Sequence, residues 1–154
     1  QDCQTYGYQG NRSVDSIHKE LGHVMWEYVG MARTKQSLET AIEKLKEVEK
    51  IFWSDLRIPG AADTLNIELE KALRLLDFIE IGKLMAYDAL NREESCGGHF
   101  REEHQTEEGE AKRNDEEFSY VACWRYTGEG NEPELLKEDL NYQYIKVQQR
   151  NYKN

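Results

Sequence analysis

The sequence lacks the features of membrane-spanning, disulfide-rich and metal-cluster proteins. No apolar run approaches the roughly twenty residues that a membrane helix needs, so we expect no direct membrane span. The three cysteines are far apart and form no CxxC pair, which argues against a clustered iron–sulfur or structural zinc site and predicts free thiols in a reducing cytoplasm. The N-terminus has no basic region followed by an apolar one, so no export signal is expected.

An initiating methionine and a basic cluster are also missing. The first absence predicts a fragment of a longer polypeptide. The second leaves a formal net charge of -10 without local compensation. The acidic excess is strongest from Arg92 to Glu117, where ten acids and four bases give a local charge of -6. Such a surface repels phosphate backbones, so we expect no nucleic-acid partner.

Apolar residues with helical spacing dominate the first part of the chain. The first helix is predicted from Val14 to about Val29, with Ser13 as its N-cap. The second follows Thr34, whose hydroxyl can cap its first turn, and ends before the breaker segment 57–60. Each helix has an apolar stripe and a charged remainder, the pattern of a helix that packs against other helices.

A third helix is predicted over about 65–90, with Asp63 or Thr64 as its N-cap. Its apolar positions place Leu73 and Leu76 near the bundle centre. Three amphipathic helices with short connections favour an antiparallel bundle of the spectrin-repeat type. The expected fold is therefore mainly α.

After the third helix the periodicity ends, and an irregular, charged segment begins. Phe118–Tyr126 is rich in β-branched and aromatic residues, and a second candidate strand covers 134–140. The two predict a short C-terminal β-hairpin. The chain is accordingly divided into a linker or coil (1–12), the three-helix bundle (13–91) and a C-terminal extension with hairpin and tail (92–154).

Few residues suggest chemistry. His99 and His104 lie among carboxylates, so a small metal-dependent enzyme is one alternative, but their spacing differs from the i, i+4 pair that directs two histidines at one ion. Gly97–Gly98 follows a predicted helix, where a dinucleotide loop would follow a strand. An alternative interpretation, compatible with a docking role, is that Gly97 or Gly98 supplies a left-handed C-cap for the helix. No catalytic, cofactor-binding or metal-binding residue is assigned.

Two stretches of the chain resemble a known family. Leu90–Glu103, LNREESCGGHFREE, resembles the segment that ends the helical bundle in the flavoproteins of succinate dehydrogenase, fumarate reductase and L-aspartate oxidase. Met25–Arg33 resembles the same family's first helix and arginine turn, and Leu38, Ala41 and Leu45 match its second helix. The resemblance implies the C-terminal helical domain of such a flavoprotein subunit.

The chain departs from the family pattern at two places. Cys96 stands where arginine is usual, and Gln105–Thr106 stands where an aromatic–proline pair is common. The departures favour a divergent member of the succinate/fumarate group. The hairpin and tail after Tyr126 favour the respiratory flavoproteins over L-aspartate oxidase, whose C-terminal domain remains an alternative.

The resemblance also implies a cofactor, partners and a location. In this family an FAD-binding domain and a mobile capping domain, both upstream of the bundle, hold the flavin and the dicarboxylate. We therefore expect FAD in the parent subunit and no cofactor in this chain. The implied partners are the FAD-binding domain of the same subunit and an iron–sulfur subunit. The parent complex is expected to be peripheral on the cytoplasmic face of the inner membrane.

An interdomain docking site is predicted where the family motif lies. Its candidate residues are Arg92, Glu94, Ser95, His99 and Arg101. Arg92 and Arg101 look like isolated, exposed cations in an acidic stretch, so we expect Arg101→Ala to leave the stability of this domain nearly unchanged. The alternative from a different class is a free-standing acidic helical module that binds proteins.

Overall fold

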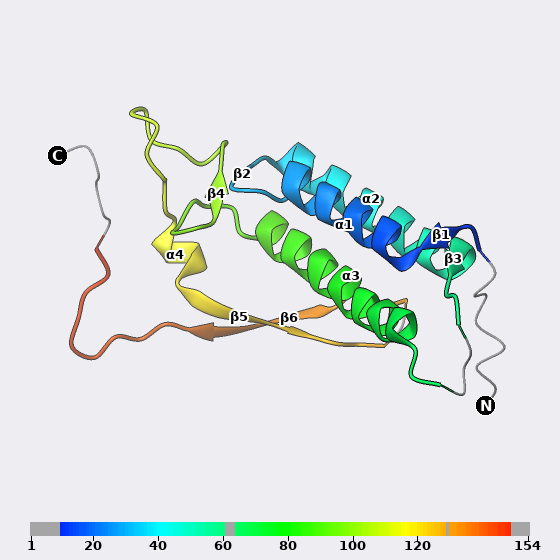
Figure 1. Ribbon diagram of the computed structural model, residues 1–154. Helices are drawn as coiled ribbons and strands as arrows, with labels where there is room; N and C mark the ends of the chain where they lie inside the picture. The colour runs from blue at the N-terminus through cyan, green and yellow to red at the C-terminus, as the bar shows by residue number, and fades with distance from the viewer. Residues whose placement is uncertain (1–9, 61–63, 129, 149–154) are drawn as a thin grey trace.

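Three long helices lie side by side with alternating direction, and a β-hairpin runs along the third (Figure 1). The computed structural model describes residues 10–60, 64–128 and 130–148. In chain order the elements are β1 (Arg12–Ser13), α1 (Val14–Tyr28), β2 (Ala32–Arg33), α2 (Lys35–Asp55), β3 (Leu56–Arg57), α3 (Ile67–Asn91), β4 (Phe100–Arg101), α4 (Asp115–Phe118), β5 (Tyr120–Arg125) and β6 (Glu134–Asp139). The predicted mainly-α bundle with a C-terminal hairpin is confirmed.

The first two helices begin at the predicted caps. Ser13 accepts a hydrogen bond from the backbone N–H of Ser16, 3.2 Å away. Thr34 accepts one from the N–H of Ser37 at 3.0 Å, and the Ser37 hydroxyl accepts one from the N–H of Thr34 at 3.0 Å. This reciprocal pair satisfies two amides that have no partner inside the helix.

The predicted start of the third helix is wrong. The N-cap of α3 is Asn66, whose side-chain oxygen accepts hydrogen bonds from the N–H groups of Glu68 and Leu69 at 3.1 and 3.2 Å. Thr64 lies before the helix, and Asp63 lies outside the described residues. The prediction failed because several residues in this stretch are good caps, and the local sequence does not rank them.

The predicted apolar face of α3 is only partly correct. Leu76 packs against the core, but Leu73 is 58% exposed, and Leu65 lies outside the helix and is 94% exposed. The buried positions of α3 are Ala72, Leu75, Ile79, Gly82, Ala86 and Ala89. The inward face therefore excludes Leu73 and consists mostly of alanine and glycine, together with Leu75 and Ile79.

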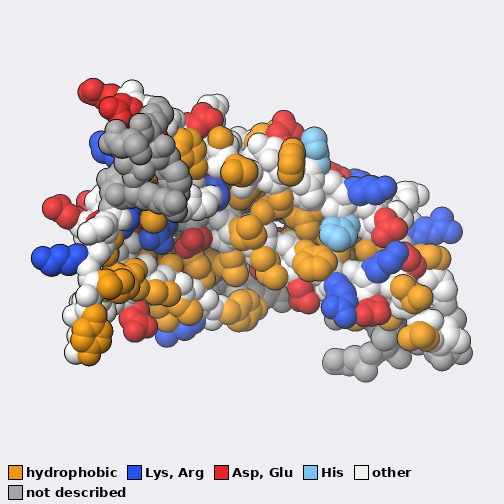
Figure 2. Space-filling view, turned by 60° about the vertical axis from the view of Figure 1, so that its left-hand side comes forward, with side chains coloured by type: hydrophobic (Ala, Val, Ile, Leu, Met, Phe, Trp, Pro, Cys, Tyr) orange, Lys and Arg blue, Asp and Glu red, His pale blue; other side chains and the backbone are white. Residues whose placement is uncertain are grey.

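Close helix packing explains this composition. A Cβ at Gly82 would lie 3.2 Å from the Met25 sulfur and 3.6 Å from Cδ1 of Leu21, both on α1. Alanine and glycine let α1 approach α3, while Leu73 is directed outward. Hydrophobic side chains are accordingly also spread over the surface, across the middle of the face in Figure 2.

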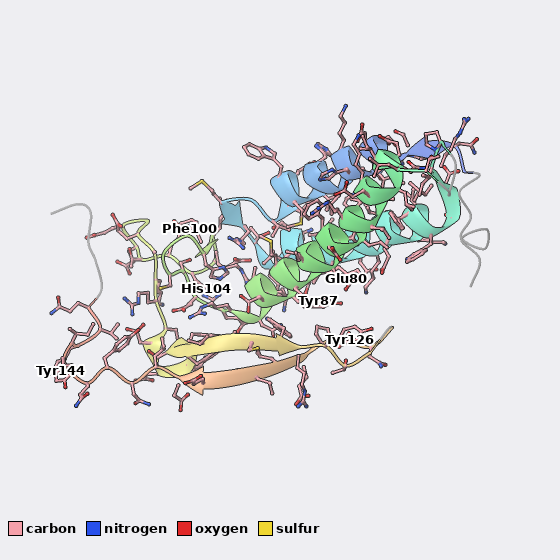
Figure 3. The ribbon with its side chains drawn as sticks, turned by 60° about the horizontal axis from the view of Figure 1, so that its bottom comes forward. Glu80, Tyr87, Phe100, His104, Tyr126 and Tyr144 are labelled. Carbon is pink, nitrogen blue, oxygen red and sulfur yellow. The ribbon has the colours of Figure 1, made fainter. Side chains whose placement is uncertain are left out.

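The hairpin is tied to α3 by a side-chain hydrogen bond. β5 and β6 are antiparallel, with Tyr120 opposite Asp139 and Arg125 opposite Glu134. The indole N–H of Trp124 donates to a carboxylate oxygen of Asp88 on α3 at 2.9 Å. Figure 3 shows the hairpin running along the bundle. The bond orients β5 against α3.

Two short parallel bridges join segments at opposite ends of the bundle. β1 pairs with β3 at one end, and β2 pairs with β4 at the other. The second bridge attaches the C-terminal extension to the connection between α1 and α2 (Figure 1). In the part of the chain that the structure describes, the helices include none long and apolar enough to cross a membrane.

Candidate docking site

The segment after α3 folds into a tight turn and returns to the bundle. Cys96 and His99 exchange backbone hydrogen bonds of 2.8 and 3.1 Å. Gly97 occupies the left-handed region at φ +59°, which an L-residue adopts only with strain. The predicted helix cap is therefore wrong: α3 ends at Asn91 with Arg92 as C-cap, and Gly97 serves the turn between two loop segments.

Arg101 is a buried structural residue. Its side chain is 2% exposed, and Nη1 donates to the carbonyl oxygens of Ala89 and Leu90 at 2.9 and 3.2 Å. These are among the last carbonyls of α3, which have no partner inside the helix and carry the negative end of its dipole. Nε lies 3.3 Å from a Glu103 oxygen. The expectation of an exposed, isolated Arg101 is therefore wrong.

Ser95 fixes the backbone of Arg101. The fully buried hydroxyl accepts a hydrogen bond from the Arg101 N–H at 2.8 Å and donates one to the Arg101 carbonyl at 3.1 Å. The serine thereby acts as a strand neighbour would, by satisfying both backbone groups. Ser95 and Arg101, two predicted docking residues, meet inside the domain.

Arg92 and Glu94 form a second internal contact. Arg92 Nε lies 2.9 Å from Glu94, whose side chain is 2% exposed, and Nη2 donates to the Phe118 carbonyl at 2.8 Å. The other Glu94 oxygen accepts from the Asn114 N–H at 2.9 Å. The pair links the end of α3 to α4. Arg92 is thus not an isolated cation either.

His99 lies between the two arginine contacts. Its Nε2 is 2.8 Å from the Arg92 carbonyl oxygen, which assigns the proton to Nε2. Burial lowers the pKa of His99, and the nearby Arg33, Arg101 and Arg92 lower it further, while the hydrogen bond to the carbonyl opposes them. The ring is therefore favoured in its neutral form.

Arg33 is the functional candidate that the predicted set omitted. It is the register partner of Arg101 across the β2–β4 bridge, and its Nη2 donates to the Gly98 carbonyl at 3.4 Å. Its Nε is shielded from solvent and has no hydrogen-bond partner among the residues that the structure describes. Burial and the charge of Arg101 lower the pKa of Arg33, and Asp88 opposes them. The sequence did contain a signal for Arg33, because this residue ends the segment Met25–Arg33 that resembles the arginine turn of the family.

A metal site receives no support at this end of the molecule. Phe100 on β4 and His104 after it lie at one end of the bundle (Figure 3), and His99 is hydrogen-bonded to the Arg92 carbonyl. Within 10–60, 64–128 and 130–148, no group of three or more His, Cys, Asp or Glu side chains comes together in a way that could hold a metal ion.

A cleft of about 630 Å³ lies between α2, α3 and the turn of the hairpin. Its lining combines aromatic side chains with charged ones, and Tyr87 and Tyr126 mark its two sides in Figure 3. Lys83 in the cleft contacts Glu49 and Glu80, both at 2.7 Å. Because carboxylates already neutralise this lysine, the cleft is a weaker candidate for ligand binding than the arginine end.

The fold and this site together define a C-terminal helical domain of the flavoprotein type. The chain belongs to the family described as the fumarate reductase flavoprotein C-terminus, whose model matches residues 18–152. All of the bundle except the first turn of α1 lies within that match, together with the motif after α3 and the hairpin.

Individual relatives agree with the family. The fumarate reductase flavoprotein subunit of Proteus vulgaris is 30% identical over 132 residues, 86% of this chain and 21% of that protein. A solved quinol–fumarate reductase with menaquinol molecules is 25% identical with a TM-score of 0.76, covering 93% of this chain and 24% of that chain. L-aspartate oxidase 2-b of Nicotiana tabacum is 31% identical over 84 residues, 54% of this chain and 13% of that protein. The chain therefore spans less than a quarter of these relatives.

Proposed function

We propose that this chain is the structural and docking domain of an FAD-dependent flavoprotein subunit whose parent enzyme interconverts succinate and fumarate. The observation that carries the proposal is the family match over residues 18–152, which includes the segment after α3 and the hairpin. The fumarate reductase relative matches 86% of the chain and the L-aspartate oxidase 54%, which supports the succinate/fumarate branch.

The residues that the structure describes do not fit FAD. Dinucleotide sites use a glycine-rich turn between a strand and a helix N-terminus at the edge of a parallel sheet. Here both parallel pairings are two residues long, and the Gly97–Gly98 turn follows a helix. We therefore assign FAD and the dicarboxylate to an upstream part of the parent subunit and derive no chemical step within this chain.

The proposed partners are the FAD-binding domain of the same subunit and an iron–sulfur subunit. The end of the bundle around the Cys96–His99 turn is proposed as the docking surface, with Arg92, Glu94, Ser95 and Arg101 as its internal support. A rigid support matters because a surface that is already ordered loses little entropy on docking. The parent complex is placed on the cytoplasmic face of the inner membrane as a peripheral assembly.

The proposal is tested on the full-length polypeptide that contains this chain. The purified protein is expected to be yellow with bound FAD, and to oxidise succinate with a dye as electron acceptor or reduce fumarate with reduced viologen. The 154-residue chain alone is the control and is expected to show neither flavin absorbance nor turnover. A flavin-free, inactive full-length protein, or a flavin-loaded isolated chain, contradicts the proposal.

A further inference from the structure

We propose that Arg33 receives an Asp or Glu carboxylate of the FAD-binding domain, at a contact that also includes Trp26, Met31 and the Gly97–Gly98 turn. The inference rests on the proposed function, because it takes the flavin-binding part of the same subunit as the partner. It assigns the charged contact to a residue outside the set predicted from the sequence.

Arg33 differs from the other arginines of the described chain. Six of them pair with a carboxylate; these are Arg12, Arg74, Arg92, Arg101, Arg113 and Arg125. Neither Arg33 nor Arg57 forms such a pair among the described residues. Arg57 is exposed, so water solvates it, whereas Nε of Arg33 is shielded from water and has no hydrogen-bond partner in the described part of the chain. A partly buried guanidinium without a paired carboxylate is unfavourable, and a carboxylate of the partner that reaches its Nη donors would relieve this.

The shape of the guanidinium favours a carboxylate. Its N–H donors form a planar fork that binds both oxygens of a carboxylate at once. Within the described residues the Nη2 donor reaches only the Gly98 carbonyl, at the long distance of 3.4 Å. That bond leaves donor capacity on the guanidinium.

The residues around Arg33 favour a protein partner over a small anion. Trp26 is 85% exposed and Met31 is 86% exposed, and both belong to the end of α1 and the connection that carries Arg33. Tryptophan, methionine and arginine are the side chains enriched at protein interfaces. A free anion would meet the net charge of -10 without gaining these apolar contacts.

The glycine turn leaves the backbone beside Arg33 open. A Cβ at Gly97 or at Gly98 would meet no atom within 4 Å. A partner surface can therefore approach the main chain closely at this point. The neutral His99 beside the turn adds no positive charge, so Arg33 is the cation that a docking acid meets there.

The experiment uses Arg33→Lys in the full-length subunit and a carbodiimide, which joins a lysine amine to a carboxylate within contact distance. The expected product, identified by mass spectrometry, links position 33 to an Asp or Glu of the FAD-binding domain. Arg57→Lys is the matched control, because Arg57 also ends a two-residue parallel bridge but is exposed at the opposite end. The control is expected to give no such link.

Hydrogen exchange supplies the second measurement. It separates the inference about Arg33 from the proposed docking function of the domain. In the wild-type subunit, peptides covering 26–33 and 96–99 are expected to exchange at least about tenfold more slowly than in the 154-residue chain, and Arg33→Gln should remove most of this protection. Protection elsewhere on this chain, with no link from position 33, overturns the inference and leaves the proposed function standing. No added protection anywhere contradicts the proposed docking itself.

Discussion

The two ends of the bundle use the same backbone device with different side-chain chemistry. Each end is closed by a two-residue parallel bridge. At the β1–β3 end, Arg12 pairs with Glu20 at 2.6 Å, and both side chains are partly exposed. At the β2–β4 end, Arg101 is buried and bonds to the carbonyls that end α3. The comparison leads us to expect that the contribution of an arginine to stability depends on its burial and partners more than on the local charge of the sequence.

The largest difference is expected when the buried arginine is removed. Arg101→Ala should lower the free energy of unfolding of the 154-residue chain by about 3–5 kcal/mol, because it leaves two helix-end carbonyls and Glu103 without their partner. Urea unfolding followed by circular dichroism measures the change. An unchanged urea midpoint would mean that Arg101 contributes no more to stability than an exposed charge does, and that the two ends of the bundle do not differ.

Two leucines on α3, one buried and one exposed, provide a reference for the size of these losses in unfolding free energy. Leu75 is 1% exposed, so Leu75→Ala should cost about 2–5 kcal/mol through lost burial and a cavity. Leu73→Ala, two residues away and 58% exposed, should cost less than about 1 kcal/mol. The same unfolding measurement applies to both. Equal losses would mean that the inward face of α3 has been assigned wrongly.

A substitution at the β1–β3 end should change the stability only weakly. Arg12→Ala removes a partly exposed pair with Glu20 and should cost about 1 kcal/mol or less, with the loss shrinking further in high salt. Unfolding curves at low and high ionic strength measure both effects. A cost equal to that of Arg101→Ala would break the comparison.

The smallest expected effect is a pH dependence at the β2–β4 end. The folded pKa of His99 is lowered by burial and by the neighbouring arginines, so the unfolded chain takes up this proton first as the pH falls. Stability should therefore decline as pH drops below about 6.5, the usual histidine value, and level off below the folded pKa. Unfolding of wild type and His99→Asn across pH 5–8 measures the difference, and parallel curves would exclude the assignment.

The local sequence was sufficient for the elements whose causes are local. Ser13 and Thr34 sit next to the amides that they cap, and the two strands of the hairpin are close in the chain. The inward face of α3 was harder to predict from the sequence. A periodicity argument gives most weight to leucines, whereas Gly82 determines how closely α1 approaches.

The candidate site required three-dimensional information. Arg101 bonds to carbonyls 11 and 12 residues earlier in the chain, and Glu94 bonds to an amide 20 residues later. The motif drew attention to the correct segment through its resemblance to a family. It did not show which side chains turn inward, because that depends on where the ends of α3 and α4 meet. That Nε of Arg33 lacks a hydrogen-bond partner among the described residues likewise became visible only once its surroundings were known.

The opposed positions of the two bridges also have a mechanical consequence. The 15 residues of α1 separate the β1–β3 end from the β2–β4 end by roughly 22 Å at a helical rise of about 1.5 Å per residue. A contact at Arg33 therefore acts at about this distance from the β1–β3 bridge at the other end. A tilt of about 5° about that end displaces the Arg33 corner by about 2 Å, which is enough to break a hydrogen bond. When Arg33 is held by the proposed contact, the bundle cannot tilt about the β1–β3 end without breaking that contact.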